Sequence, residues 1–384
     1  MSYKNIYILG VGGSGMSSIA KFLKQKGDNV IGYDQRKSYV TNLLNQDGIK
    51  VVHTLDEITY KPDNVYIYSS AIPIESERFE AFYDKENVLS RPEYLKILSE
   101  HHKIIGITGT HGKTSTTALL SHIFHFNNLN VSYLYGGITT FNGIGGHYGD
   151  TDQPLILETD EAFNTFEKIK ISDLLVLNVD SDHLDYFKNL QNYKDAFYKV
   201  MNNVMDNLVI NNDDQNIKSM KELKKPVTYG TDISADFRVL SPGNFIYENN
   251  KYEIKSDIIG DHFKSNMLGA IILALLNGIE IKDSLNAIES FAGVKRRIEL
   301  IGISNGVSIY DDYGHHPTEM EATITALKQQ SENKLYVVFQ PHRYTRTKEY
   351  FNLFKDSLEL ADYAIVTDIY PAGELPIPGI SSKN

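Results

Sequence analysis

The sequence has no cysteine and no tryptophan among its 384 residues. The lack of cysteine excludes disulfides and thiolate metal sites, so histidine and carboxylate side chains are the expected metal ligands. No apolar run approaches the roughly 20 residues that a membrane-spanning helix needs, and the N-terminus M-S-Y-K-N lacks the apolar region of a signal peptide. We therefore expect a cytoplasmic protein with no membrane partner.

Positive charge is also scarce, since 38 Lys and Arg face 49 Asp and Glu, giving a formal net charge of -11. With no long basic block, nucleic acid is not expected as a main partner, and local Lys and Arg must bind any anionic substrate. A content of 41% hydrophobic and 23% charged residues is typical of a soluble globular protein. The length predicts two or three domains, each able to bury a core.

The most informative stretch is residues 103–126, where a short apolar run leads into G-T-H-G-K-T-S and then into apolar residues at helical spacing. This order predicts a strand, a phosphate loop and a helix. In such a loop, Lys113 would place its charge on the β- and γ-phosphates, and the Thr114 hydroxyl could bind Mg²⁺. The longer pattern G-x-x-x-x-G-K-[ST] is not met because Ile107 stands at its first glycine. The alternative is a strand-to-helix turn beside a chance Lys-Thr pair.

A second glycine-rich loop lies near the N-terminus, after the strand-like residues 4–9. Gly10, Gly12 and Gly15 fit the pattern G-x-G-x-x-G, and a second strand-like segment ends at Asp34, about 20 residues further on. The pattern by itself favours a dinucleotide, although the same turn can hold any pyrophosphate, including that of a UDP-sugar. Asp34 either contacts a ribose hydroxyl or only caps the end of its strand.

Acidic residues follow two further strand-like segments, residues 154–162 and 174–185. Because the carboxyl ends of parallel strands line one crevice, Glu158 and His183 could lie near Thr114, as Mg²⁺ ligands or beside them. Asp182 and Asp185 could converge there as well. A solvated acidic turn is the alternative for four single carboxylates: Asp160, Glu161, Asp182 and Asp185.

The last third of the chain holds four polar clusters. The helix-like stretch from residue 260 presents His262 and Asn266 one turn apart, unless Asn266 only bonds the backbone. The run K-R-R at 295–297 is either a solvated face or a phosphate contact made when domains close. Two turns then follow strand-like segments. The first, before a helix expected around Pro317, could orient a nucleophile or a metal-bound phosphate, or bury its histidines in the core: Asp311, Asp312, His315 and His316. The second could bind a carboxylate through its arginines: His342, Arg343 and Arg346.

The chain resembles the Mur ligases of peptidoglycan synthesis in eight motifs that occur in order: G-V-G-G-S-G-M, G-T-H-G-K-T-S, D-H-L-D, H-F-K-S-N, K-R-R, D-D-Y-G-H-H-P-T-E, F-Q-P-H-R-Y-T-R-T and Y-P-A-G-E-L-P-I-P-G. The resemblance covers essentially the whole chain. It implies an α/β protein of three domains: a Rossmann-like UDP-substrate domain at 1–100, a central P-loop ATPase-type domain at 101–295 and a C-terminal Rossmann-like amino-acid domain at 296–384.

The resemblance also implies an activity, namely ATP-dependent amide formation between the lactyl carboxylate of UDP-N-acetylmuramic acid and L-alanine, through an acyl phosphate. ATP and Mg²⁺ would be the cofactors, and the protein would be a monomer or homodimer. The alternatives are a sister ligase that attaches a recycled murein peptide to the same sugar nucleotide, or a nucleotide-binding module without catalysis. Family members continue beyond P-I-P-G, so we expect the last domain to be incomplete and this chain to bind both nucleotides but to ligate slowly or not at all.

Carried over residue by residue, the resemblance implies four groups of functional residues. The ATP-binding group is Gly109, Thr110, His111, Gly112, Lys113, Thr114, Ser115, His262, Asn266 and Arg297. The metal ligands are Thr114, Glu158 and His183. The catalytic group is Lys113, Glu158, His183, Asp312 and His315. The substrate-binding group is Gly12, Gly13, Ser14, Gly15, Asp34, Ser70, Arg91, His342, Arg343 and Arg346.

Overall fold

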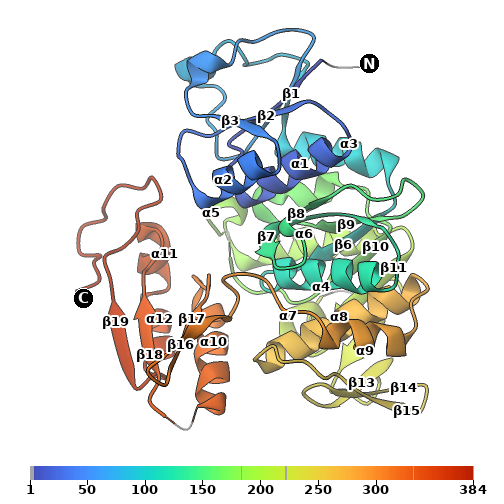
Figure 1. The fold of residues 1–384 in the computed structure, drawn as a ribbon. Helices are drawn as coiled ribbons and strands as arrows, with labels where there is room; N and C mark the ends of the chain where they lie inside the picture. The colour runs from blue at the N-terminus through green and yellow to red at the C-terminus, as the bar shows by residue number, and fades with distance from the viewer. Residues whose placement is uncertain (1–3, 183, 221–222, 332, 384) are drawn as a thin grey trace. The chain divides into compact units, whose positions relative to one another are not determined.

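The structure is a computed structural model that describes residues 4–182, 184–220, 223–331 and 333–383. It contains two compact units, which we describe separately. The larger unit is formed by residues 1–255 together with 266–294, and the smaller by residues 256–265 together with 295–384. Both are built from alternating helices and strands (Figure 1).

The first sheet of the larger unit has five parallel strands in the order β3-β2-β1-β4-β5, the order typical of a Rossmann fold. The strands are β1 (Ile6–Leu9), β2 (Val30–Tyr33), β3 (Lys50–Val52), β4 (Val65–Tyr68) and β5 (Val88–Ser90). The helices are α1 (Ser14–Gln25), α2 (Tyr39–Gln46) and α3 (Arg91–His101), with short 3₁₀ helices η1 (Leu55–Glu57) and η2 (Glu77–Phe79).

Both faces of this first sheet carry packed side chains, which explains why its strands are mostly apolar. On one face Ile8 packs in the same core as Phe22 of α1. On the other face Tyr66 packs edge-on against Phe82, with ring centroids 5.1 Å apart. The carboxyl ends of the strands stay free for loops, and the first glycine-rich loop leaves β1 at that edge.

The second sheet of the larger unit has ten strands in the order β15-β14-β13-β12-β11-β10-β6-β9-β7-β8. Strands β9, β6, β10 and β11 run parallel at its centre, so their carboxyl ends meet at one edge. The strands are β6 (Ile104–Thr108), β7 (Ser132–Thr139), β8 (Gly143–His147), β9 (Leu155–Glu158), β10 (Asp173–Val176), β11 (Asn207–Asn211), β12 (Val227–Gly230), β13 (Phe237–Ser241), β14 (Asn244–Tyr247) and β15 (Asn250–Glu253). The helices are α4 (Lys113–Phe126), η3 (Ala162–Lys168), α5 (Leu184–Phe187), α6 (Leu190–Asn202), α7 (Gln215–Lys218), α8 (Asp261–Leu276) and α9 (Ile281–Glu289).

The hairpin of β7 and β8, which sequence reasoning did not predict, joins the two sheets by packing on α1. A Cβ on Gly146 would lie 2.1 Å from the Ser18 carbonyl oxygen, so only glycine allows this approach. The buried Lys21 of α1 donates hydrogen bonds to the carbonyl oxygens of Asn142 and, at 3.3 Å, of Ile144. The two sheets are thus parts of one packed unit.

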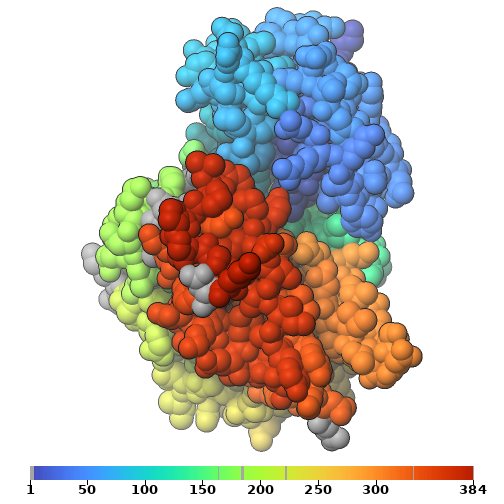
Figure 2. Space-filling view, turned by 90° about the vertical axis from the view of Figure 1, so that its left-hand side faces the viewer, coloured from blue at the N-terminus to red at the C-terminus, as the bar shows by residue number. Residues whose placement is uncertain are grey.

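The smaller unit contains two short sheets. One is the antiparallel hairpin of β16 (Glu299–Ser304) and β17 (Val307–Asp311), and the other is the parallel pair β18 (Tyr336–Phe339) and β19 (Tyr363–Val366). Its helices are α10 (Pro317–Gln330), α11 (Tyr344–Glu349) and α12 (Phe351–Leu358). Phe339 and Phe354 pack in its core, and the last part of the chain, red in Figure 2, forms one packed mass. Across the described residues of both units, no helix is long and apolar enough to span a membrane.

Candidate functional site

The phosphate loop connects β6 to α4, as predicted, and its conformation requires glycine. Gly109 has φ 141° and Gly112 has φ 86°, both in the region that side chains disfavour. A Cβ on Gly112 would lie 2.4 Å from the Asn266 amide nitrogen. Asn266, on α8, therefore lies directly against the loop, where the start of α4 presents its free N–H groups.

Lys113 is held in the loop by four contacts. Its Nζ donates to the carbonyl oxygens of Gly109 at 2.6 Å and Thr110 at 3.1 Å, and it pairs with both Glu161 oxygens at 2.9 and 3.0 Å. Burial opposes the charge on Lys113, but the carboxylates of Glu161 and Asp160 outweigh it and raise the pKa of Lys113 above its ordinary value. Glu161 is only 1% exposed, so a solvated turn is the wrong interpretation of this residue.

Glu158, at the end of β9, has both carboxylate oxygens fixed. Oε1 accepts a hydrogen bond from the Thr114 hydroxyl at 2.8 Å, and Oε2 accepts one from the Gly136 N–H at 2.6 Å. The register of β7 shifts between Leu134 and Ile138, which is where the chain turns the Gly136 amide toward Glu158. Thr114 and Glu158 are therefore brought together, whereas His183 lies outside the described residues.

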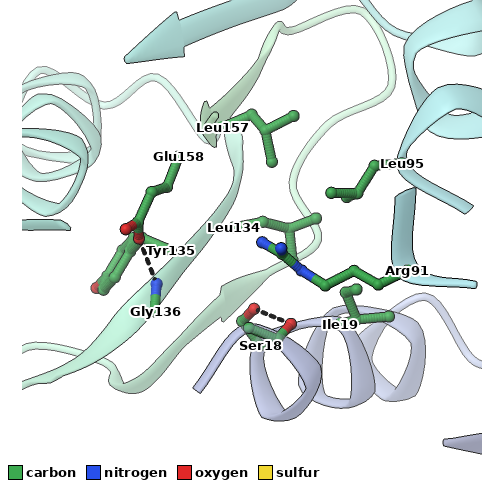
Figure 3. A pocket seen from close by; sticks show the side chains of 10 residues that line it. Ser18, Ile19, Arg91, Leu95, Leu134, Tyr135, Gly136, Leu157 and Glu158 are labelled. Carbon is green, nitrogen blue, oxygen red and sulfur yellow. Dashed lines mark hydrogen bonds between the residues drawn. The ribbon is translucent and has the colours of Figure 1, made fainter. Parts of the chain in front are cut away.

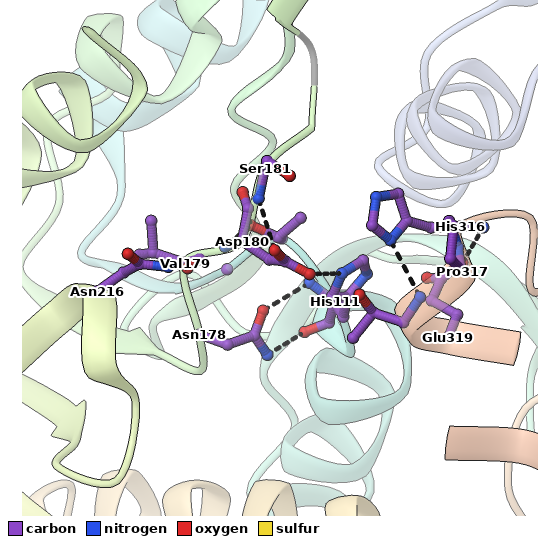
Figure 4. Close-up of polar contacts among 12 residues, drawn as sticks. His111, Asn178, Val179, Asp180, Ser181, Asn216, His316, Pro317 and Glu319 are labelled. Carbon is purple, nitrogen blue, oxygen red and sulfur yellow. Dashed lines mark hydrogen bonds and ion pairs between the residues drawn. The ribbon is translucent and has the colours of Figure 1, made fainter. Parts of the chain in front are cut away.

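The segment after β10 holds the other side of the phosphate loop (Figure 4). The Asn178 side chain accepts from the His111 N–H at 2.8 Å and donates to the His111 carbonyl at 3.0 Å. Asp180 lies 3.3 Å from His111 Nε2, and its own N–H donates to the Thr110 hydroxyl at 2.8 Å. Sequence reasoning missed Asn178, although its position two residues after a buried strand is a usable signal.

Tyr193 on α6 is a second residue that sequence reasoning missed. It is fully buried, and its hydroxyl lies 3.0 Å from the Thr110 hydroxyl and 3.4 Å from Glu161. Burial raises the pKa of Tyr193, so its hydroxyl stays neutral. Nothing in the local sequence separates this tyrosine from the other 24 in the chain.

The first glycine-rich loop is held by Asp34. Asp34 Oδ2 accepts from the Gly12 N–H at 2.9 Å, and Oδ1 accepts from the Arg36 N–H at 3.0 Å. A Cβ on Gly12 would lie 2.7 Å from Oδ2, so this close contact also requires glycine. Both carboxylate oxygens therefore contact backbone around the loop.

A cavity of about 270 Å³ separates this loop from the edge of the second sheet. Its walls include Ser14, Ser70, Arg91, Glu158 and Asp160. Figure 3 shows the neighbouring pocket, where Arg91 extends from α3 and Glu158 bonds the Gly136 amide. Arg91, which lies on the first loop, and Glu158, which is bonded to the phosphate loop, therefore line one continuous region within the larger unit.

In the smaller unit, Asp312, Arg297 and His315 lie around one carboxylate. Glu319 of α10 is 3.8 Å from Arg297 and 3.7 Å from His315. Asp312 accepts two backbone hydrogen bonds at 2.6 and 2.8 Å, and burial raises its pKa above the ordinary value despite them. Sequence reasoning missed Glu319, which also lies in the D-D-Y-G-H-H-P-T-E motif.

His262, one turn before Asn266 on α8, packs its ring against Phe263, with ring centroids 4.3 Å apart.

The turn after β18 brings its three predicted residues together with a fourth. Arg343 has φ 72° and its Nε donates to Glu374 at 2.6 Å, while Arg346 is 9% exposed. Burial opposes the charge on Glu374, but hydrogen bonds from Thr345 and Arg343 lower its pKa to about 2. Burial also lowers the pKa of His342. Glu374 lies in the motif Y-P-A-G-E-L-P-I-P-G, and sequence reasoning missed it.

Comparison with known proteins matches three family models in order along the chain. Residues 5–103 match the catalytic domain of the Mur ligase family, residues 107–274 the Mur ligase middle domain, and residues 296–382 the Mur ligase glutamate ligase domain. Curated relatives cover nearly the whole chain. UDP-N-acetylmuramate--L-alanine ligase of Caldicellulosiruptor saccharolyticus is 38% identical over 98% of this chain and 86% of its own length. The ligase of the same name from Dictyoglomus turgidum is 35% identical over 100% of this chain and 86% of its own length.

Solved structures give the same result. The UDP-N-acetylmuramate-alanine ligase of Thermotoga maritima has a TM-score of 0.80 and 27% identity, covering 95% of this chain and 85% of its own. A murein peptide ligase of Psychrobacter arcticus shares the fold at a TM-score of 0.70, with 20% identity, over 95% of this chain and 90% of its own. The α/β fold of three domains that the resemblance implied is confirmed, and the chain belongs to the Mur ligase family.

Proposed function

We propose that this protein is an ATP-dependent ligase that joins L-alanine to the lactyl carboxylate of UDP-N-acetylmuramic acid, in the cytoplasmic synthesis of peptidoglycan precursors. The names of the curated relatives and of the Thermotoga maritima structure support this reaction. The observation that carries it is the cavity beside the first glycine-rich loop, because Glu158 lines that cavity and is bonded to Thr114 of the phosphate loop. A sugar nucleotide held by the first loop can therefore extend its carboxylate toward ATP.

The reaction must overcome the poor reactivity of a carboxylate. Transfer of the γ-phosphoryl group of ATP to a carboxylate oxygen releases ADP and gives an acyl phosphate. The amine of L-alanine then attacks the acyl carbon, and phosphate leaves. Holding the groups in place for these steps can be worth roughly 7–11 kcal/mol.

Lys113 would bind the β- and γ-phosphates, since it is kept charged by its acidic neighbours. Thr114 and Glu158 would hold Mg²⁺, because a hydroxyl and a carboxylate whose oxygens lie 2.8 Å apart are the oxygen donors that Mg²⁺ prefers. Bound Mg²⁺ supplies positive charge against the transferred phosphoryl group. The loop N–H groups at the start of α4 would contact phosphate oxygens.

The remaining predicted residues are assigned binding roles from the hydrogen-bond donors and charges that they carry. Ser14, Gly15 and Arg91 would bind the diphosphate of the sugar nucleotide through N–H groups at the start of α1, a hydroxyl and a guanidinium. Residues of the smaller unit would act on the nucleotide or on L-alanine, and among them Arg346 offers a planar fork for the amino-acid carboxylate.

The test is a product analysis with purified protein, ATP, Mg²⁺, UDP-N-acetylmuramic acid and L-alanine. We expect phosphate release that depends on the sugar nucleotide, and a mass-spectrometric product heavier than it by one alanine residue. Replacing L-alanine by a murein tripeptide should give no product. Faster ligation of the tripeptide would instead assign a peptide-recycling ligase, and binding of both nucleotides without ligation would assign a non-catalytic module.

A further inference from the structure

Arg91 and Asp160 form an ion pair across the cavity that the sugar nucleotide would occupy. Arg91 Nη1 lies 3.8 Å from Asp160 Oδ2, and the two side chains are 20% and 33% exposed. Both residues line the 270 Å³ cavity. A guanidinium that faces an anion site is thus paired with a carboxylate of its own protein.

The position of Arg91 is set by its surroundings. A Cβ on Gly15 would lie 2.9 Å from Arg91 Nε and 3.1 Å from Cζ, so the guanidinium lies directly on the glycine-rich loop. Arg91 Nε is buried and has no hydrogen-bond partner within the described ranges. The guanidinium therefore has a donor left for a further anionic oxygen while it remains on the loop.

Asp160 is held independently of Arg91. Its Oδ1 accepts a hydrogen bond from the Ala162 N–H at 2.9 Å, and its carbonyl oxygen accepts one from the Phe166 N–H at 3.2 Å. These bonds fix the turn into η3, so that Oδ2 is the oxygen that faces the guanidinium. An anion arriving at Arg91 must compete with an oxygen that is already in place.

We propose that Asp160 is the resting partner of Arg91, a built-in competitor that the anionic sugar nucleotide displaces when it binds. This inference rests on the proposed function, because it takes UDP-N-acetylmuramic acid as the displacing anion. Asp160 then limits affinity for the sugar nucleotide instead of contributing to it. A carboxylate that only positioned Arg91 would have the opposite effect.

The experiment is calorimetric binding of UDP-N-acetylmuramic acid, without ATP, to the full chain and to Asp160→Asn. Asparagine keeps an oxygen for the Ala162 N–H, so the turn into η3 is preserved. We expect the dissociation constant to fall by about two- to fivefold, the range that a partly exposed ion pair commonly contributes. Weaker binding by Asp160→Asn overturns the inference.

A double-mutant cycle separates competition for Arg91 from the loss of one negative charge. Asp160→Asn should leave binding unchanged when it is added to Arg91→Ala, and Asp152→Asn, on the exposed turn before β9, should leave it unchanged in the otherwise unmodified chain. Equal tightening in either control overturns the inference and indicates general electrostatics. If the unmodified chain binds no UDP-N-acetylmuramic acid, the proposed function fails together with the inference. If it binds and ligates while Asp160→Asn binds less tightly, only the inference fails.

Discussion

The two glycine-rich loops of the larger unit each connect a strand to a helix, but they differ in the conformation and contacts of the glycine that caps that helix. Each leaves a buried strand and starts a helix. The helix after the first loop has Gly13 as its N-cap, at φ -70° and ψ 143°, which any residue can adopt. The helix after the phosphate loop has Gly112, at φ 86°, packed against Asn266. The first loop tolerates a side chain at its cap, and the second does not.

The charges around the two loops differ as well. The first loop has no cation of its own and depends on Arg91, from a helix more than 70 residues later in the chain. The phosphate loop carries Lys113, and a buried carboxylate already pairs with it. A glycine pattern therefore predicts an anion site, while the neighbouring charges decide which anion and how tightly it is held.

The largest effect is expected from a substitution that removes the cation of the phosphate loop. Lys113→Ala should lower the turnover of ATP by roughly 10²-fold or more, as is usual when one preorganised charge is lost. Binding of UDP-N-acetylmuramic acid should stay near that of the unmodified protein, because the first loop depends on Arg91. Phosphate release and calorimetry measure the two effects. Lys168→Ala, an exposed lysine of η3, is the control, and comparable turnover by both variants would refute the assigned role.

The helix caps should respond differently to the same substitution. Gly112→Ala forces a side chain into the left-handed region, at about 1–2 kcal/mol, and onto the Asn266 amide, so its unfolding midpoint in urea should fall clearly. Gly13→Ala has its nearest neighbour at 3.4 Å and should change the unfolding free energy by about 0.5 kcal/mol at most. Circular dichroism follows unfolding, since the chain has no tryptophan. Equal losses would show that the two caps are equivalent.

A smaller effect is expected at the carboxylate beside both loops. Glu158→Gln replaces a charged oxygen donor by an amide, so the Mg²⁺ concentration for half-maximal turnover should rise by about tenfold or more. High Mg²⁺ should restore part of the activity, because Lys113 is unchanged. Glu167→Gln, which loses a surface pair with Lys199, should need no extra Mg²⁺. An unchanged Mg²⁺ requirement in Glu158→Gln would remove this residue from the metal site.

The smallest effect tests the hairpin that joins the two loops' sheets. Burial, with smaller contributions from the charges of His125 and Lys21, lowers the pKa of His147 to about 4. Between pH 6.5 and 4, His147 binds a proton in the unfolded chain but stays neutral in the folded chain. The free energy of unfolding therefore falls as the pH falls through that range. His147→Gln should reduce the loss of stability between pH 7 and 5, measured by urea unfolding. An unchanged pH dependence would contradict the assignment.

The sequence predicted the parts of the fold that depend on short-range patterns. The order of strand, glycine-rich loop and helix was correct at both loops, and α10 begins at Pro317 as expected. It also brought Thr114 and Glu158 to one place, because parallel strands end at a common edge. These features follow from periodicity and from the topology of parallel sheets.

The sequence did not predict contacts that depend on packing between distant segments. Glu161 could not be told from a solvated acid, since its burial comes from Tyr193 and Lys113, which lie far away in the chain. The hairpin of β7 and β8 was missed because glycine is uncommon in strands, whereas four of its five glycines make room for side chains or backbone packed against them: Gly136, Gly137, Gly145 and Gly146. The pairing of Arg91 with Asp160 likewise has no local signal.

The contact between α1 and β8 has a consequence for recombining this protein with its relatives. The family models divide the chain between residues 103 and 107, which suggests that the first hundred residues are an exchangeable module. Yet Lys21 is bonded to carbonyls of the hairpin, Phe22 packs on Tyr148 at 5.2 Å, and Gln25 accepts from the Tyr148 N–H at 3.0 Å. A chimera cut at residue 105 would thus place a foreign α1 on this hairpin. The exchangeable block is the first sheet together with residues 132–148, two stretches that must be inherited as a pair.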